Sequence, residues 1–135
     1  MTKSTGLPSR HNSVLLIDDN ELDNFINQKV MEAHHFAETF YKALNGREAI
    51  DLLQALGPQN KFPAAIFVDL NMPVMDGFQV LEYLTSDTSA LSDDTLLVVL
   101  TSSENESDKE RAFSIAPRVR FLNKPLTASD LAQLM

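Results

Sequence analysis

Residues 64–77 read AAIFVDLNMPVMDG: an unbroken apolar run, then an aspartate, then a turn that contains a proline and a glycine. An apolar run without alternation is typical of a strand that helices cover on both faces. Asp69 would then stand at the carboxyl end of a buried strand, which is where open parallel α/β sheets bind their ligands. The stretch predicts a functional carboxylate at position 69.

Other strand-like runs end in polar residues in the same way. Asp18 and Asp19 follow residues 14–17, Thr101 and Ser102 follow residues 96–100, and Lys124 follows residues 119–122. Because the carboxyl ends of parallel strands lie at one edge of a sheet, we expect these side chains to meet.

Helical patterns alternate with the strand-like ones along the chain. Leu22, Phe25, Ile26, Val30 and Ala33 recur at helical spacing, and residues 36–43 then read as a strand. Further helices are predicted over residues 45–56 and 78–84, a short or mobile one over 103–116, and a last one that starts at Thr127 with Asp130. Five strands alternating with five helical segments predict an α/β fold, a three-layer α/β/α sandwich with right-handed crossovers.

Composition limits the classes of function. The chain has 135 residues, the size of one domain, and a net charge of −8, which disfavours direct binding to nucleic acid or to an anionic membrane. It has no cysteine, so thiol catalysis is excluded. No apolar stretch has the length of a membrane span, and no signal peptide is evident, so we expect no membrane insertion and a cytoplasmic location. Residues 1–12 read as a flexible leader and residues 13–135 as the domain, with a last helix that is short or truncated.

The residues at the predicted edge suit phosphoryl chemistry. Three carboxylates, of Asp18, Asp19 and Asp69, offer oxygen ligands to a hard divalent cation, and Mg²⁺ is the natural candidate because it uses few carboxylates together with a phosphate. The Thr101 hydroxyl and the Lys124 ammonium would receive the remaining phosphate oxygens.

Each of these residues also has a simpler interpretation. Asp18 and Asp19 are equally typical of caps for a helix that begins near Asn20, and Asp69 of a turn before a proline. Thr101 and Ser102 would ordinarily begin a helix, Lys124 would be a solvated charge, and Phe121 would be a core residue. The coincidence at several strand ends favours the shared site.

The motifs at these strand ends resemble those of the receiver domain of two-component response regulators, especially the stand-alone, chemotaxis-type kind. They read LLIDDN at 15–20, VDLNMPVMDG at 68–77, VLTS at 99–102 and FLNKP at 121–125. The resemblance extends from about residue 13 to residue 135. It implies a five-stranded parallel sheet of order 2-1-3-4-5, as in flavodoxin.

The resemblance also implies a role for each site residue. Asp69 would be the phosphoacceptor. Mg²⁺ would be held by Asp18 through water, by Asp19 and Asp69, and by the backbone carbonyl of Asn71. Backbone N–H groups near Leu70 and Ser102 would assist Lys124 in binding the phosphoryl oxygens.

A switch is implied as well. Thr101 would bond the attached phosphate, and Phe121 would be the switch aromatic that fills the space the threonine leaves. Lys124-Pro125 would be a cis peptide. The phosphodonor would be a sensor histidine kinase or a histidine phosphotransfer protein, and output would pass to an unidentified protein target by protein–protein interaction.

Three other functions compete with this interpretation. One is a receiver-like interaction module that takes no phosphate. Another is a haloacid-dehalogenase-type phosphatase, but such enzymes carry an acid two residues after the nucleophile, where this chain has Asn71. A flavodoxin-like cofactor binder would need a phosphate loop after the first strand, and acids stand there instead. We therefore expect no classical enzyme, only catalysis by the domain of its own phosphorylation and autodephosphorylation.

Overall fold

The computed structural model describes residues 11–86 and 91–134. Most of the expected leader, residues 1–10, and residues 87–90 of the linker before the fourth strand lie outside this part. The first strand begins at His11, two residues before the expected start of the domain at Ser13. Within the described ranges, no helix has both the length and the apolar character that crossing a membrane requires.

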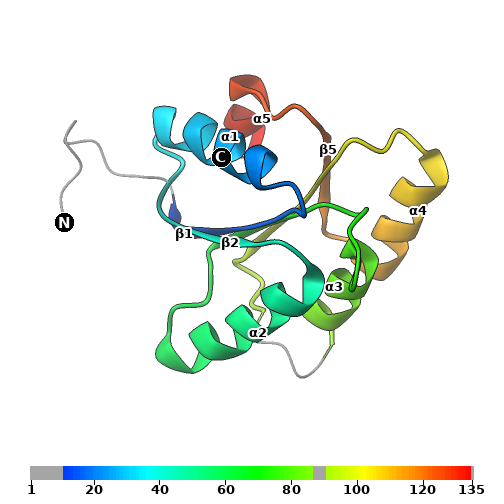
Figure 1. The fold of residues 1–135 in the computed structure, drawn as a ribbon, viewed down its shortest axis with the longest axis horizontal. Coiled ribbons are helices and arrows are strands. Elements are labelled where there is room, and N and C mark those ends of the chain that lie inside the picture. Colours follow the sequence, from blue (N-terminus) through cyan, green and yellow to red (C-terminus); the bar gives the residue numbers. More distant parts are fainter. Residues whose placement is uncertain (1–10, 87–90, 135) are drawn as a thin grey trace.

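The expected parallel sheet of order β2-β1-β3-β4-β5 is confirmed (Figure 1). Its strands are β1 (His11–Ile17), β2 (Ala37–Ala43), β3 (Ala65–Val68), β4 (Leu96–Thr101) and β5 (Arg120–Asn123). All four neighbouring pairs are parallel. The strand order reverses between β1 and β3, so a crevice is expected there at the carboxyl edge.

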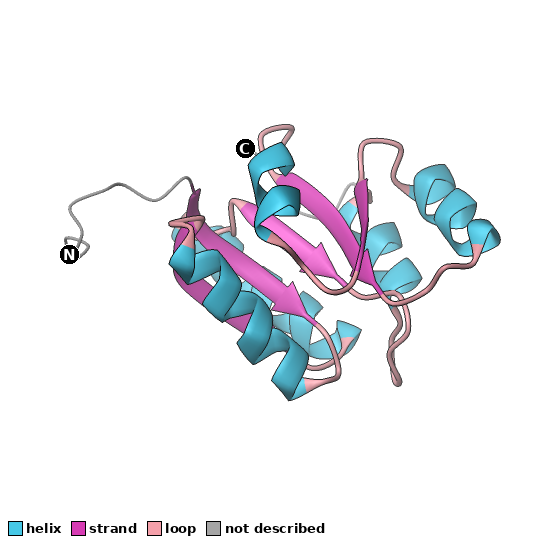
Figure 2. Ribbon diagram, turned by 90° about the horizontal axis from the view of Figure 1, so that it is seen from above, coloured by secondary structure: helices cyan, strands magenta, loops and turns pink. Residues whose placement is uncertain are grey.

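Helices cover both faces of the sheet, as Figures 1 and 2 show. They are α1 (Glu21–Ala33), α2 (Gly46–Leu56), the short 3₁₀ helix η1 (Gly57–Gln59), α3 (Gly77–Leu84), α4 (Glu106–Ile115) and α5 (Ala128–Leu134). Alternate strand residues point to opposite faces. Leu15 and Ile66 therefore join the core beneath α2 and α3, and Leu16 and Phe67 join the core beneath α1 and α5.

Asparagines cap the first two helices. The Asn20 side chain accepts hydrogen bonds from the backbone N–H groups of Leu22 and Asp23, so neither Asp18 nor Asp19 caps α1. Asn45 caps α2 as expected, although the Glu48 carboxylate reaches the N–H of Leu44 and not that of the cap residue. Because Asn20 is the cap, the side chains of Asp18 and Asp19 can take part in a site at the edge of the sheet.

The N-terminal half of α1 turns its apolar side chains to the surface, contrary to the expectation from the sequence pattern. Leu22, Phe25 and Ile26, which share the expected apolar face, have exposed fractions of 62%, 52% and 46%. The buried face carries Asn24 and Asn27 in the N-terminal half of the helix and Met31 in its C-terminal half. The reason is that the N-terminal half of α1 lies against the acidic strand ends, where polar partners are needed: the Asn24 side-chain amide donates to the carbonyl oxygen of Asp18 at 3.1 Å.

Val74, between β3 and α3, holds a backbone conformation that β-branched residues avoid. Its φ is 70°, and the N–H of Met75 donates to the carbonyl of Pro73 at 2.8 Å, closing a three-residue turn around it. We expect Val74→Gly to raise the free energy of unfolding by about 1 kcal/mol, because the relieved strain of about 1–3 kcal/mol exceeds the entropic cost of a glycine. Urea denaturation measures the difference.

Val74→Ala is the matched control for this substitution. It keeps a Cβ at the same positive φ, so it should recover less stability than glycine does. The side chain of Val74 is 81% exposed, so lost packing contributes little to either variant. An unfolding midpoint that is unchanged in Val74→Gly would show that the turn stores no strain.

Candidate functional site

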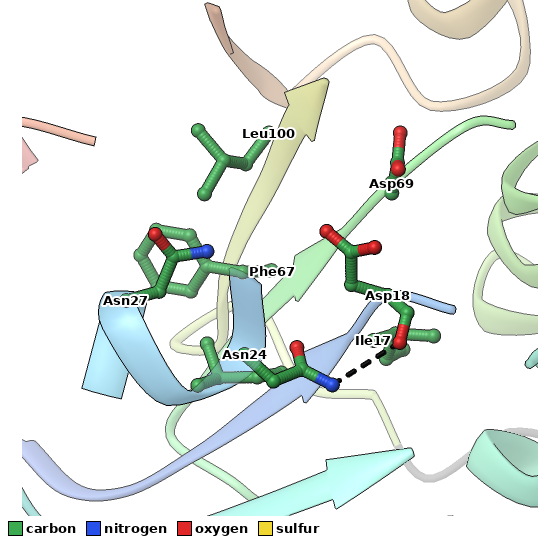
Figure 3. Close-up of a pocket in the computed structure, with 8 residues that line it drawn as sticks. Ile17, Asp18, Asn24, Asn27, Phe67, Asp69 and Leu100 are labelled. Carbon is green, nitrogen blue, oxygen red and sulfur yellow. Dashed lines mark hydrogen bonds between the residues drawn. The ribbon is translucent and has the colours of Figure 1, made fainter. Parts of the chain in front are cut away.

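Three carboxylates meet at the carboxyl edge of the sheet. Carboxylate oxygens of Asp18, Asp19 and Asp69 lie within 4.8 Å of one another. In Figure 3, the side chains of Asp18 and Asp69 rise side by side from the ends of β1 and β3. Asp18 and Asp69 are buried and Asp19 is exposed. An all-oxygen set that opens to solvent on one side fits a hard divalent cation such as Mg²⁺.

Lys124 links the two buried carboxylates. Its Nζ donates to Oδ2 of Asp18 at 2.5 Å and to Oδ2 of Asp69 at 3.2 Å. It also donates to Oδ2 of Asp23, in the first turn of α1, at 2.9 Å. The lysine precedes Pro125 through a cis peptide bond, as expected. One ammonium therefore offsets part of the negative charge of two buried carboxylates and of the partly exposed Asp23.

Burial and pairing act in opposite directions on this lysine. Burial by itself would lower the pKa of the Lys124 ammonium. Hydrogen bonds to Asp18 and Asp23, together with the nearby charge of Asp69, hold that pKa well above its ordinary value. The ammonium thus stays charged at neutral pH.

Burial in this cluster shifts the pKa of Asp18 as well. Burial raises the pKa of its carboxyl, and the hydrogen bonds from Lys124 and from the Asn20 N–H offset only part of that rise. The negative charge on Asp18 is therefore partly uncompensated, and a second cation at this edge would stabilise it.

A narrow cavity lies beneath the carboxylates, between the sheet and α1. Asp18, Asn24, Asn27 and Asp69 supply its polar lining, and Phe67 is among its apolar residues (Figure 3). The Asn24 amide therefore holds the backbone at the end of β1, through the carbonyl oxygen of Asp18, next to this cavity.

Thr101 lies at the same edge, but its hydroxyl is engaged with its own loop. The side chain is fully buried, and its Oγ1 accepts a hydrogen bond from the N–H of Ser103 at 3.2 Å. The carbonyl oxygen of Thr101 accepts from the N–H of Lys124 at 2.9 Å, which ties the end of β4 to the loop after β5. An inward turn of the hydroxyl would have to break the bond to Ser103.

Phe121 lies on β5, beside α4. Its half-buried ring stands 6.2 Å from that of Phe113, and the Lys109 ammonium lies 5.8 Å above it. Along this side runs a surface pocket of about 320 Å³, lined among others by Ser103, Asn105 and Phe121. The predicted switch aromatic thus borders a surface that is open to partners and is not sealed in the core.

The predicted backbone ligands lie in the turns beside the carboxylates. The N–H of Asn71 donates to Oδ1 of Asp69 at 3.4 Å. Leu70 is buried and lies two residues after the end of β3, and Ser102 is exposed and directly follows β4. The metal-binding role of the Asn71 carbonyl and the phosphate-binding roles of Leu70 and Ser102 stay predictions.

Two residues of the site escaped the sequence analysis. A Cβ at Gly77 would lie 2.3 Å from the carbonyl oxygen of Asp69, so α3 can pack against the strand end only with glycine at this position. Asp23 reaches Lys124 from a helix and not from a strand end. Asp23 lies three residues after Asn20 and shares a helix face with Asn24 and Asn27. This spacing is the sequence feature that could have indicated its place in the site.

Comparison with known proteins agrees with this geometry. The chain matches the family model of the response regulator receiver domain over residues 14–135. It shares 29% identity and a TM-score of 0.84 with a two-component response regulator from Cytophaga hutchinsonii, covering 93% of this chain and 94% of that one. The phosphorylated cyanobacterial phytochrome response regulator RcpA gives 27% identity and a TM-score of 0.73, covering 92% of this chain and 86% of that one.

Curated relatives differ in length. The probable methanogenesis regulatory protein FilR2 of Methanothrix harundinacea is 29% identical over 119 residues, which are 87% of this chain and 75% of that protein. The chain spans only 16–19% of three longer relatives. Together with the site and the sheet order, the family match shows that the chain belongs to the response regulator receiver domain family.

Proposed function

We propose that this receiver domain is a phosphorylation-dependent signalling switch whose phosphoacceptor is Asp69. The observation that supports the proposal most directly is the bridge from Lys124 to Asp18 and Asp69, which places a cation beside the only buried carboxylate at the end of β3. RcpA, a relative of similar fold, is known in a phosphorylated form.

The proposed reaction is a direct phosphoryl transfer. A carboxylate oxygen of Asp69 attacks the phosphorus of a phosphohistidine and forms a P–O bond while the P–N bond breaks. The electron pair of the broken bond returns to the imidazole nitrogen, which takes up a proton from solvent. Such transfers depend mainly on positioning and on neutralising charge, and Lys124 is placed for both tasks.

Mg²⁺ is the proposed cofactor, held by Asp18, Asp19, Asp69 and the backbone carbonyl of Asn71. When bound, it would offset the negative charge of the phosphoryl oxygens. The convergence of the three carboxylates, whose oxygens lie within 4.8 Å of one another, supports this assignment.

The proposed output begins at Thr101. When phosphate is attached, the hydroxyl turns from the Ser103 N–H toward a phosphoryl oxygen, and the ring of Phe121 moves into the vacated space. The contacts of that ring with Phe113 and Lys109 then change, and with them the surface of α4 and β5 that an unidentified protein target binds.

The proposed phosphodonor is a sensor histidine kinase or a histidine phosphotransfer protein. A donor must bring its histidine to Asp69, so it has to cover the surface next to this edge. The exposed side chains of Leu22, Phe25 and Ile26 begin one helical turn beyond Asp19, and a pocket of about 380 Å³ adjoins them beside Phe25, Lys42 and Leu44. We propose this outward face of α1 as the docking surface for an apolar helix of the donor.

Truncation of Phe25 separates docking from chemistry. We expect Phe25→Ala to slow transfer from a phosphohistidine-bearing protein roughly tenfold, as for the loss of a large buried aromatic anchor. Labelling by a small acyl phosphate should be unchanged, because that donor needs no docking surface. Equal rates of protein-to-protein transfer in Phe25→Ala and wild type would place the donor on another surface.

The central experiment is intact-mass analysis after incubation with Mg²⁺ and a small acyl phosphate. Addition of one phosphoryl group, prevented by a metal chelator, is expected of the switch. Absence of labelling together with failure to bind fluoroberyllate would support the interaction module. Steady turnover of several phosphate esters would support the phosphatase.

A further inference from the structure

A fourth carboxylate reaches the site from outside the strand ends. Lys124 Nζ has three hydrogen-bond acceptors: Asp18 at 2.5 Å, Asp23 at 2.9 Å and Asp69 at 3.2 Å. A lysine ammonium carries three N–H donors, so each of them faces a carboxylate. In this state Lys124 has no donor left for a phosphoryl oxygen.

Asp23 differs from the other two partners. Asp18 and Asp69 belong to the carboxylate cluster that would hold a divalent cation, whereas Asp23 is not part of it. A bound cation therefore offers new partners to those two carboxylates and none to Asp23. The Asp23 side chain is 35% exposed, so it can also turn toward water when Lys124 leaves.

The helix fixes the position of Asp23. Its backbone N–H donates to the side chain of Asn20 at 3.1 Å, and this cap sets the start of α1. The same rotation of the helix turns Leu22 and Phe25 outward. The carboxylate therefore meets Lys124 through a capped, rigid first turn and not through a loop.

We propose that Asp23 is a positioning residue that holds Lys124 back from the phosphoryl group and so lowers the affinity of the site for phosphoryl-like anions. Its carboxylate competes with phosphoryl oxygens for one N–H of the lysine ammonium. The inference rests on the function proposed above, and it adds a residue that sets how readily the receiver domain takes up a phosphoryl group.

The test compares fluoroberyllate binding by wild type and Asp23→Asn at saturating Mg²⁺, by titration calorimetry. Partly exposed ion pairs contribute modestly, so we expect the variant to bind about fivefold more tightly. Asp23→Glu, which keeps the charge, should bind as wild type does. Glu21→Gln is the matched control, because it removes an exposed acid from the same first turn without a hydrogen bond to Lys124 among those the structure describes.

A double-mutant cycle tests whether Asp23 acts through the lysine. In a Lys124→Ala background, Asp23→Asn should leave fluoroberyllate affinity unchanged. The same gain in both backgrounds, or a matching gain in Glu21→Gln, would reduce Asp23 to a general charge effect and overturn the proposal. Unchanged or weaker binding by Asp23→Asn in the wild-type background would overturn it as well.

Failure of this inference is distinguishable from failure of the proposed function. A wild type that takes neither phosphoryl groups nor fluoroberyllate refutes the switch, and the role of Asp23 falls with it. A wild type that takes both, with an Asp23→Asn variant that behaves identically, refutes the role of Asp23 alone.

Discussion

Asp69→Asn is expected to take up no phosphoryl group from an acyl phosphate under conditions that label wild type to one group per chain. The substitution keeps the shape of the side chain but replaces the nucleophilic carboxylate oxygen by an amide. It also removes the buried acid at the end of β3. The exposed Asp19 follows β1, so it does not take the place of Asp69. Intact-mass analysis with saturating Mg²⁺ measures the loss.

Asp51→Asn serves as the matched control. Asp51 is an exposed acid on α2 whose carboxylate pairs with Arg47 at 3.5 Å, away from the sheet edge, so this variant should label as wild type does. Urea denaturation should show that Asp69→Asn remains folded. Full labelling of folded Asp69→Asn would show that another residue is the phosphoacceptor and would contradict the proposed chemistry.

Lys124→Ala is expected to slow phosphorylation by about 10²–10³-fold, the usual loss when a preorganised charge at a developing anion is removed. Mg²⁺ binding should persist, because the three carboxylates remain. Without metal, the variant should be less stable than wild type by about 3 kcal/mol, since Asp18 and Asp69 are left buried without their cation. Added Mg²⁺ should recover much of that loss by binding the folded state.

Labelling rates and urea denaturation with and without Mg²⁺ separate these effects. Lys61→Ala is the control, because Lys61 is exposed and lies before β3, far along the strand from its carboxyl end. Wild-type rates of labelling, or wild-type binding of a protein target by phosphorylated Lys124→Ala, would contradict the role given to this lysine.

The parts of the fold that depend on local pattern were predictable. The apolar runs 14–17 and 96–100 are typical of strands in a parallel sheet that helices cover on both faces, and they form β1 and β4. The Thr127–Asp130 pair predicted the start of α5, and each residue's N–H donates to the other's side chain. The family motifs then supplied the strand order, which pattern alone leaves open.

The sequence pattern predicted the wrong buried face for the N-terminal half of α1. Helical spacing of Leu22, Phe25 and Ile26 indicates an apolar stripe, and burial is its usual outcome. The outcome is reversed because this helix begins beside three carboxylates, whose partners must be polar. Which face of a helix meets such a cluster depends on neighbours that are distant in sequence, and no window along the chain contains them.

The sequence by itself determined the strand ends, and therefore the membership of Asp18, Asp19, Asp69, Thr101 and Lys124 in one edge of the sheet. Only the tertiary structure decided how these groups are paired: that Lys124 bonds three acids, that Asp23 is one of them, and that the Thr101 hydroxyl faces Ser103. The physical reason is range. Strand and helix patterns are local, whereas Lys124 meets Asp18 and Asp23 across more than 100 residues, through a packing of layers that no local rule contains.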